Sequence, residues 1–263
     1  MRIISWNVNG IRAVEKKWEI QSFIETYTPD ILFLQEIKAK PDQLSEYLLT
    51  PENYRVHYNP AEKAWYAGTG VWIHRWVSDI ADIRFLDSFP EDPTANEGRV
   101  AHIEMTVAGE VYDIFGIYFP NGGKSEDAWQ GKLVFYAKFA SYMDMLRLQG
   151  HHVLWWGDLN CAHHEIDLAR PKANEGKIGF HPLERAWLDG RVNDGWSDIF
   201  RTKYGNIPDV YSWWDVITRS RLTNVGWRID AWWGSEGVTQ KTKNVEYLSD
   251  QMGSDHCPIS IEL

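Results

Sequence analysis

"HVLWWGDLN", residues 152–160, joins an apolar run to a polar pair, Asp158 and Asn160. Its length and its β-branched and aromatic side chains predict a buried strand. A second stretch near the N-terminus, "RIISWNVNG", has the same form and contains Asn7 and Asn9. Because alternate side chains of a strand point to the same face, we expect each polar pair to lie together at the end of its strand.

Strand-like runs recur along the whole chain and alternate with helical patterns. Residues 126–149 carry apolar side chains at alternating steps of four and three before Gly150, which predicts a long helix. A second helix is expected over residues 13–27, before Pro29. Since no linker or low-complexity tract divides the sequence, we expect one domain over residues 1–263, of the α/β or α+β class with packed sheets. The predicted strands are "RIISW", "DILFLQ", "GVWIHR", "RVAHIEM", "VYDIFGIYF", "HHVLWWG", "RIDAWW" and "CPISIEL".

The composition suits a domain with a sizeable core, because 44% of the 263 residues are hydrophobic and fifteen are tryptophan. The formal net charge of -10 opposes the approach of a polyanion to the protein as a whole. Net charge does not describe distribution, however. Acidic residues gathered in one pocket hold cations while lysines and arginines elsewhere meet phosphates.

Cys161 and Cys257 are too few for a disulfide scaffold, and no apolar run approaches the length of a membrane span. The N-terminus begins a strand pattern at once, which leaves no room for a signal peptide. We therefore expect a cytoplasmic protein with no membrane partner.

Oxygen-bearing side chains gather at the ends of the predicted strands. A single acid there is more often a solvated loop residue, whereas the whole set favours a binding site. Carboxylate and amide oxygens without thiolates suit a hard cation such as Mg²⁺ or Mn²⁺, which in turn recruits a phosphate. The set consists of Asn7, Asn9, Glu36, Asp158, Asn160, Asp230 and Asp255.

A histidine adjoins this set in "GSDHCP", where His256 follows Asp255. A lone histidine is more often structural than catalytic. Asp230, in "WRID", is a candidate to orient the His256 imidazole, as carboxylates commonly do.

Two other stretches offer phosphate donors. "YFPNGG" ends a predicted strand with Tyr118 and Asn121, although Pro-Asn-Gly is also an ordinary turn sequence. "EGRV" presents Arg99 either to a phosphate or to a surface acid.

The sequence offers two alternative sites. Cys161, His163 and His164 are potential zinc ligands, but they lie too close together, follow no zinc-finger spacing and lack a fourth ligand. A nucleophile built from Cys257 and His256 is disfavoured because adjacent strand residues point to opposite faces.

Seven motifs, found in one order from end to end, closely resemble those of the exonuclease III family of abasic-site DNA endonucleases. The family lies within the endonuclease/exonuclease/phosphatase superfamily, which shares the short motif "SDHCP". The motifs are "SWNVNGIRA", "LFLQEIKA", "YFPNG", "GDLNCAHHEIDLARPK", "GFHPLERAWL", "NVGWRIDAW" and "GSDHCPI".

The resemblance implies a four-layer α/β sandwich, in which two packed β-sheets are flanked by helices. It also implies Mg²⁺-dependent cleavage of the phosphodiester 5′ to an abasic site in double-stranded DNA, together with activity at 3′ ends. By position, Glu36 matches the family's principal metal ligand, and Asp255 matches a residue that assists the metal region. Asn9 stands where certain relatives carry a second-site ligand, Asp, so one metal or two remain open.

Carried over in the same way, Asp158 matches the acid that orients or deprotonates the attacking water, with Asn160 and Asn7 holding it in place. His256, paired with Asp230, matches the group that contacts the scissile phosphate. Such an assembly pairs an activated water with charge neutralisation on the other side of the phosphate.

The resemblance also assigns substrate contacts. Tyr118 and Asn121 match further phosphate or leaving-group contacts, while Glu165 and Asp167 are expected to support the loop that follows Asp158. A pocket for the extruded abasic nucleotide matches Trp213, Trp227 and Ile229, which composition alone would assign to core packing. Segments that resemble DNA-contacting loops carry Arg12, Lys16, Tyr66, Lys124, Asn174 and Lys177.

Other functions stay open at this point. A phosphoesterase of the same superfamily that acts on a nucleotide or lipid headgroup would share the metal and His256 machinery. A catalytically silent DNA-binding module would have no need for Glu36, Asp158 and His256 together. We expect a monomeric metal-dependent nuclease.

Overall fold

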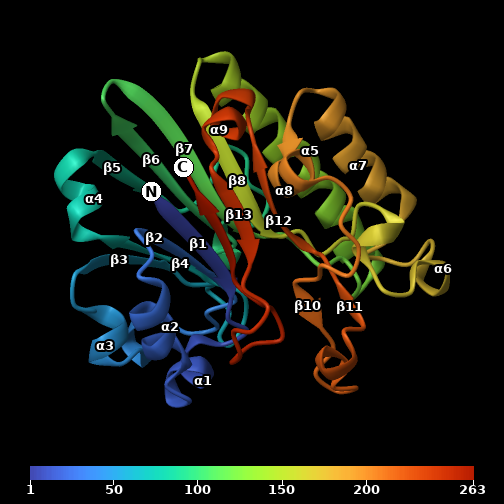
Figure 1. Cartoon of the computed structure of the whole chain (residues 1–263), viewed down its shortest axis with the longest axis horizontal. Helices are drawn as coiled ribbons and strands as arrows, with labels where there is room; N and C mark the ends of the chain where they lie inside the picture. Colours follow the sequence, from blue (N-terminus) through green and yellow to red (C-terminus); the bar gives the residue numbers. More distant parts are fainter.

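Two six-stranded sheets pack face to face at the centre of the computed structural model, which describes all residues from 1 to 263 (Figure 1). The first sheet has the order β13 (Asn244–Tyr247), β14 (Ile259–Glu262), β1 (Arg2–Asn7), β2 (Ile31–Gln35), β4 (Thr69–His74), β3 (Tyr54–Asn59). The second has the order β5 (Asp82–Leu86), β6 (Val100–Val107), β7 (Glu110–Tyr118), β8 (His152–Asp158), β12 (Asp230–Gly234), β9 (Ser197–Asp198). A separate two-stranded ribbon consists of β10 (Trp213–Trp214) and β11 (Gly226–Trp227).

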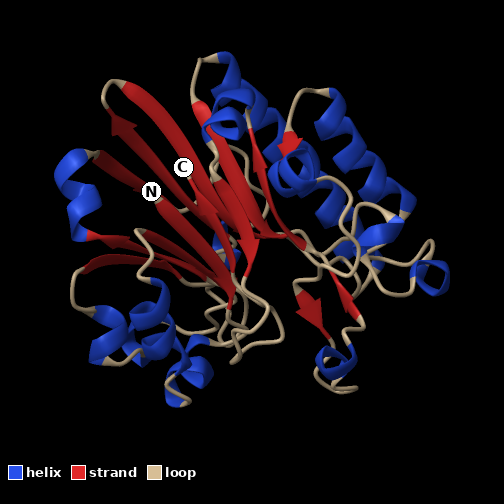
Figure 2. Cartoon of the chain, viewed as in Figure 1, coloured by secondary structure: helices blue, strands red, loops and turns tan.

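Helices cover the outer faces of both sheets (Figure 2). The first sheet packs against α1 (Ile11–Lys16), α2 (Glu19–Tyr27) and α3 (Glu46–Leu49), and the second against α5 (Glu126–Leu148) and α7 (Pro182–Asn193). The other helices are α4 (Arg75–Ile80), α6 (Pro171–Asn174), α8 (Ile199–Tyr204) and α9 (Glu236–Lys241), with 3₁₀ turns at Pro41–Gln43, Ala95–Glu97, Glu165–Asp167 and Ser220–Thr223. No helix combines the length and apolar character that crossing a membrane requires.

Strand alternation builds the layers. In β8, Leu154 and Trp156 face the core between the two sheets, while Trp155 faces α5 on the outside. The sheets approach closely where Phe33 of β2 lies against Gly116 of β7, because a Cβ at Gly116 would come within 2.5 Å of the Phe33 ring. The glycine therefore permits this contact.

The predicted four-layer α/β sandwich is confirmed, and every predicted strand is present. The expectation of one helix over residues 13–27 is wrong. The chain forms α1 and α2 instead, since Trp18 between them has a left-handed φ of 62° that interrupts the helical path.

Candidate active site

The first sheet contributes Asn7 and Glu36. Because β1 and β2 run parallel with Asn7 opposite Gln35, Glu36 follows at the same edge of the sheet. The Asn7 amide Nδ2 donates to Glu36 Oε1 at 2.8 Å and to Asp158 Oδ2 at 3.1 Å. Asp158 belongs to the second sheet, so Asn7 links the two sheets at the site.

Three neighbouring strands of the second sheet place polar side chains at that same edge. Tyr118 ends β7 opposite Asp158 in the parallel register, and Asp230 begins β12 opposite Asp158 in the antiparallel register. The Ser212 hydroxyl donates to Asp230 Oδ2 at 2.6 Å. Sheet register alone therefore brings Tyr118 and two carboxylates together.

His256 sits between those two carboxylates. Its Nδ1 lies 2.9 Å from Asp230 Oδ2, and its Nε2 lies 3.7 Å from Asp158 Oδ2. Burial opposes the charge of the imidazolium, but Asp230 and Asp158 outweigh it and raise the pKa of His256 to about 10. His256 is therefore a cation at neutral pH.

Asp158 is poised for proton transfer. Burial raises its pKa, Asp230 and Glu36 add to the effect, and His256 opposes it, giving a pKa of about 7. The backbone N–H of Asn160 donates to Asp158 Oδ1 at 2.9 Å. A fixed carboxyl group with this pKa suits a general base near neutrality.

Backbone conformation turns these side chains at the strand ends. Glu36 and Asn160 have φ of 50° and Asn9 has φ of 45°, all in the left-handed region. Asparagine tolerates this region, whereas a glutamate there costs about 1–2 kcal/mol. Such strain at Glu36 is typical of a functional position.

Asn160 and Asn121 form the next part of the site. The Asn160 side chain donates through Nδ2 to Phe119 O at 2.9 Å and accepts from Asn121 Nδ2 at 2.8 Å. Asn160 thus holds Asp158 through its backbone and Asn121 through its side chain.

A buried ion pair supports these loops from behind. Lys132 Nζ donates to Asn160 O at 3.0 Å and lies 2.5 Å from Glu184 Oε1. Glu184 Oε2 accepts the backbone N–H of Gly179 at 2.7 Å and of His181 at 3.0 Å. The sequence analysis did not predict this pair. The available indication was that Lys132 lies one turn after Trp129, on the apolar face of the helix.

A pocket of about 330 Å³ opens over these groups. Ten of its lining residues were predicted from the sequence: Glu36, Tyr118, Asn121, Asp158, Asn160, Trp213, Trp227, Ile229, Asp255 and His256. The two that were missed are Ile178 and Gly179. At Gly179 the left-handed φ of 93° and a Cβ position 3.5 Å from the Trp227 ring keep the chain close to that wall.

Asn9 and Asp255 lie next to Glu36 but bind each other. Asn9 Nδ2 donates to Asp255 Oδ1 at 2.9 Å, and Trp213 Nε1 donates to Asp255 Oδ2 at 3.1 Å. Lys38, which sequence reasoning missed, lies with Nζ 2.7 Å from Glu36 Oε2 and also donates to Asn9.

Arg99 requires a correction. Of the two expected partners, a phosphate or a surface acid, the structure shows the acid, because the guanidinium pairs with the partly exposed Glu97; Arg99 itself is only 4% exposed, so it is not available to a phosphate. Its NH1 donates to Tyr118 O at 3.2 Å, its Nε pairs with Glu97, and its NH2 donates to the Tyr66 hydroxyl. Arg99 thus supports Tyr118 and Tyr66 from beneath.

The remaining expected DNA contacts lie outside the pocket. Arg12 stacks on the Trp65 ring, 4.2 Å from its centroid, and Asn174 Nδ2 donates to Arg170 O at 2.9 Å. Lys16, Lys124 and Lys177 are exposed, and none of them lines the pocket. Glu165 is exposed, whereas Asp167 is buried against Arg228 and Arg201 and accepts the N–H of His164, which anchors the loop after Asp158.

The potential ligand atoms of Glu36, Asp158 and His256 all lie within 4.8 Å of one another. Two carboxylates this close favour a cation between them, and their oxygens suit Mg²⁺. With Nε2 of His256 protonated, the imidazolium acts as a donor, so Glu36 and Asp158 are the residues that fit the metal. The arrangement combines a base, a cationic donor and a cation site, which together define a metal-dependent phosphoesterase.

Comparisons with known proteins agree. The model of the Endonuclease/Exonuclease/phosphatase family matches residues 4–256. The chain is 35% identical over 261 residues to an exodeoxyribonuclease of Bacillus subtilis, covering 99% of this chain and 98% of the relative. It is 32% identical to a DNA-(apurinic or apyrimidinic site) endonuclease of Dictyostelium discoideum, covering 99% of this chain and 70% of the relative. The crystal structure of an AP endonuclease from Leishmania major superposes with a TM-score of 0.87 at 26% identity, covering 99% of this chain and 86% of the other.

The chain therefore belongs to the endonuclease/exonuclease/phosphatase family. The resemblance to exonuclease III and the expectation of a metal-dependent nuclease of DNA repair are confirmed.

Proposed function

We propose that this nuclease hydrolyses the phosphodiester 5′ to an abasic site in double-stranded DNA, using Mg²⁺ and leaving a 3′-hydroxyl, and that it also acts at 3′ ends. The observation that carries the proposal is the convergence of Glu36, Asp158 and His256 in a pocket walled by Trp213 and Trp227. Relatives named as exodeoxyribonucleases and abasic-site endonucleases support it.

Asp158 acts on the attacking water. The Asn7 amide and the Asn160 N–H each donate to one of its oxygens, which fixes the plane of the carboxylate. With a pKa of about 7, Asp158 orients the water and accepts its proton as the new P–O bond forms.

His256 faces the developing negative charge. Asp230 holds the ring through Nδ1, which leaves Nε2–H free to donate to a phosphate oxygen in the pocket. Tyr118 and Asn121 line the same pocket and supply neutral donors toward the phosphate or the leaving oxygen. Fixed donors of this kind stabilise the transition state more than the ground state.

Glu36 and Asp158 would hold the Mg²⁺, and Mn²⁺ would suit the same oxygen ligands. The bound ion would supply positive charge that neutralises the phosphate during attack. The Asn9–Asp255 pair beside Glu36 is intact, so we propose a single ion at this position.

Trp213, Trp227 and Ile229 form the apolar side of the pocket. Extruding a deoxyribose without its base from the duplex into such a pocket costs less free energy than extruding a paired nucleotide, because no base stacking or pairing is lost. The exposed Lys16, Lys124 and Lys177 provide cations for the DNA backbone around it, despite the net charge of -10. We propose that the chain acts as a monomeric single domain in the cytoplasm, where its two free, buried cysteines would stay reduced.

The direct test uses a duplex with one abasic analogue, incubated with the pure protein and Mg²⁺. We expect a single cut 5′ to the lesion that EDTA abolishes. An uncut duplex, or cleavage that is unaffected by EDTA, would overturn the proposal.

A substrate panel separates the alternatives. Higher kcat/KM on a small phosphodiester or an inositol phosphate than on the damaged duplex would favour another phosphoesterase. Tight binding of damaged DNA without any turnover would favour a silent binding module.

A further inference from the structure

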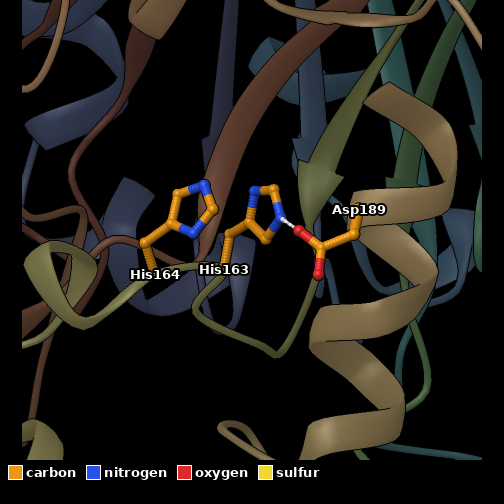
Figure 3. A group of neighbouring side chains, drawn as sticks. All are labelled: His163, His164 and Asp189. Atoms are coloured by element: carbon orange, nitrogen blue, oxygen red, sulfur yellow. Dashed lines mark hydrogen bonds and ion pairs between the residues drawn. The ribbon is translucent and has the colours of Figure 1, made fainter. Parts of the chain in front are cut away.

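A second cluster of metal-ligating side chains lies away from the pocket, where His163 and His164 meet Asp189. The histidines belong to the loop after β8, and Asp189 extends from α7 (Figure 3). The potential ligand atoms of the three residues lie within 4.8 Å of one another. We propose that these residues bind a divalent transition-metal ion, with Zn²⁺ as the best match, at a site separate from the catalytic cation.

The contact between His163 and Asp189 is close to ligand geometry. His163 Nε2 lies 2.8 Å from Asp189 Oδ1, and Figure 3 shows the carboxylate directed at the ring. Zinc bonds to histidine nitrogen and carboxylate oxygen are each about 2.0–2.2 Å long. An ion can therefore replace the shared proton between these two atoms with a shift of a fraction of an ångström.

The second imidazole is already beside the first. The rings of His163 and His164 stack with centroids 3.7 Å apart and an interplanar angle of 24°. His164 is exposed to solvent, so an ion can reach its ring from outside.

Charge and space at the cluster also favour a cation. Asp189 pairs with His163 and with no lysine or arginine. Arg185, one turn earlier on α7, instead donates through Nε to His163 O at 3.0 Å. A hollow of about 430 Å³ that His163 and His164 line leaves room for a water as the fourth ligand. Three protein ligands and one water form a common zinc arrangement.

The donor types separate this site from the catalytic one. Two imidazoles and one carboxylate favour Zn²⁺, Ni²⁺ or Cu²⁺ over Mg²⁺, whereas the carboxylate pair of Glu36 and Asp158 favours Mg²⁺. Cys161 is excluded as a ligand because its thiol is buried and accepts a hydrogen bond from the Tyr136 hydroxyl. The third ligand is Asp189 of α7 instead. It lies 26 positions after His163, so the spacing of residues in the sequence provided no sign that it is close to the loop.

Calorimetric titration of Zn²⁺ into the full chain, with Mg²⁺ in large excess, tests the proposal. We expect one equivalent to bind and to raise Tm. His164 and Asp189 are both exposed, so the variants His164→Gln and Asp189→Asn should still fold. In each variant the Kd for Zn²⁺ should rise at least about tenfold, because even the loss of a residue that only hydrogen-bonds to a ligand lowers metal affinity by this much. Circular dichroism and unchanged DNA cleavage in Mg²⁺ verify that the variants fold.

Two further variants keep the result unambiguous. His57→Ala removes another His–Asp pair, with Nε2 2.6 Å from Asp87, that lacks a second histidine, and it should bind Zn²⁺ as the unmodified chain does. Glu36→Gln disables the catalytic cation site, and this variant should still bind one equivalent of Zn²⁺. Unchanged Kd in both His164→Gln and Asp189→Asn, or loss of the equivalent in Glu36→Gln, would overturn the proposal.

Discussion

Asp158 and Asp230 are direct partners across the antiparallel pair of β8 and β12, and both carboxylates face the imidazole of His256. Two buried acids at this spacing repel each other unless a cation lies between them. The protonated His256 supplies that charge, and the balance among these three groups underlies the first three predictions.

Asp158→Asn is expected to lower kcat by about 10³-fold or more while Kd for the damaged duplex changes little. The amide preserves the shape of the side chain but cannot accept the proton of the water. Single-turnover cleavage and binding by fluorescence anisotropy measure the two quantities. An equal loss of binding and rate would contradict the assigned role.

The pH dependence of kcat/KM should be bell-shaped. Since Asp158 must be ionised, the rate rises as pH increases toward about 7, and bound Mg²⁺ moves this limb to lower pH. Since His256 must be protonated, the rate falls as pH rises through about 10. Initial rates on an abasic duplex in overlapping buffers measure both limbs, and a rate that falls with pH across neutrality would contradict this assignment.

Asp158→Asn should also raise thermal stability at neutral pH. The pKa of Asp158 is higher in the folded chain than its ordinary value of 3.8, so the folded state binds this proton more tightly. Stability from this group is present at low pH and is lost as pH rises from about 4 to about 7. In metal-free buffer at pH above 7 the variant should melt at a higher temperature than the unmodified chain, and the difference should disappear at low pH. Differential scanning calorimetry provides the comparison, and an unstable variant at high pH would refute the prediction.

Lys132→Met should destabilise the fold by about 3–5 kcal/mol, because it leaves Glu184 buried without its partner. Lys138→Met, on the same helix, removes an exposed pair with Glu91 and should leave the free energy of unfolding nearly unchanged. Urea unfolding measures both values.

The double change Lys132→Met with Glu184→Gln removes both buried charges and should recover part of that stability. Since it still frees the loops of Asn121 and Asn160, kcat on the abasic duplex should remain low. Full recovery of kcat would show that the pair has no positioning role.

Trp227→Ala should lower the preference for an abasic duplex over an intact one by about 10-fold or more, in the range that one apolar pocket contact contributes. Trp18→Ala, which removes a ring that is 73% exposed and does not line the pocket, is the control. The ratio of the two kcat/KM values is the measurement, and an unchanged ratio would remove Trp227 from substrate selection.

The fold and most of the pocket residues could be predicted from the sequence, because the end of a strand is visible as a local pattern. Asn7, Glu36 and Asp158 each follow an apolar run, and parallel register brings such ends together. Distances across the two sheets have no local signature in the sequence. Only the structure shows that the potential ligand atoms of Glu36, Asp158 and His256 lie within 4.8 Å of one another, and that Asn9 donates a hydrogen bond to Asp255.

Burial was harder to predict than position. Arg99 was a candidate phosphate contact, but the rings of Tyr66 and Tyr118 lie against its guanidinium and the residue is buried. Likewise, Lys132 and Glu184 are separated by 52 positions, and no local pattern reports their pairing.

The Asn7 bridge between the sheets has a consequence for biosynthesis. Glu36 and Asn7 come from one sheet, and Asp158 and Asp230 from the other, so neither sheet alone holds the complete site. β14, the last strand in chain order, follows His256 and pairs with β1, so the site is assembled only after this strand has been synthesised and has joined the first sheet.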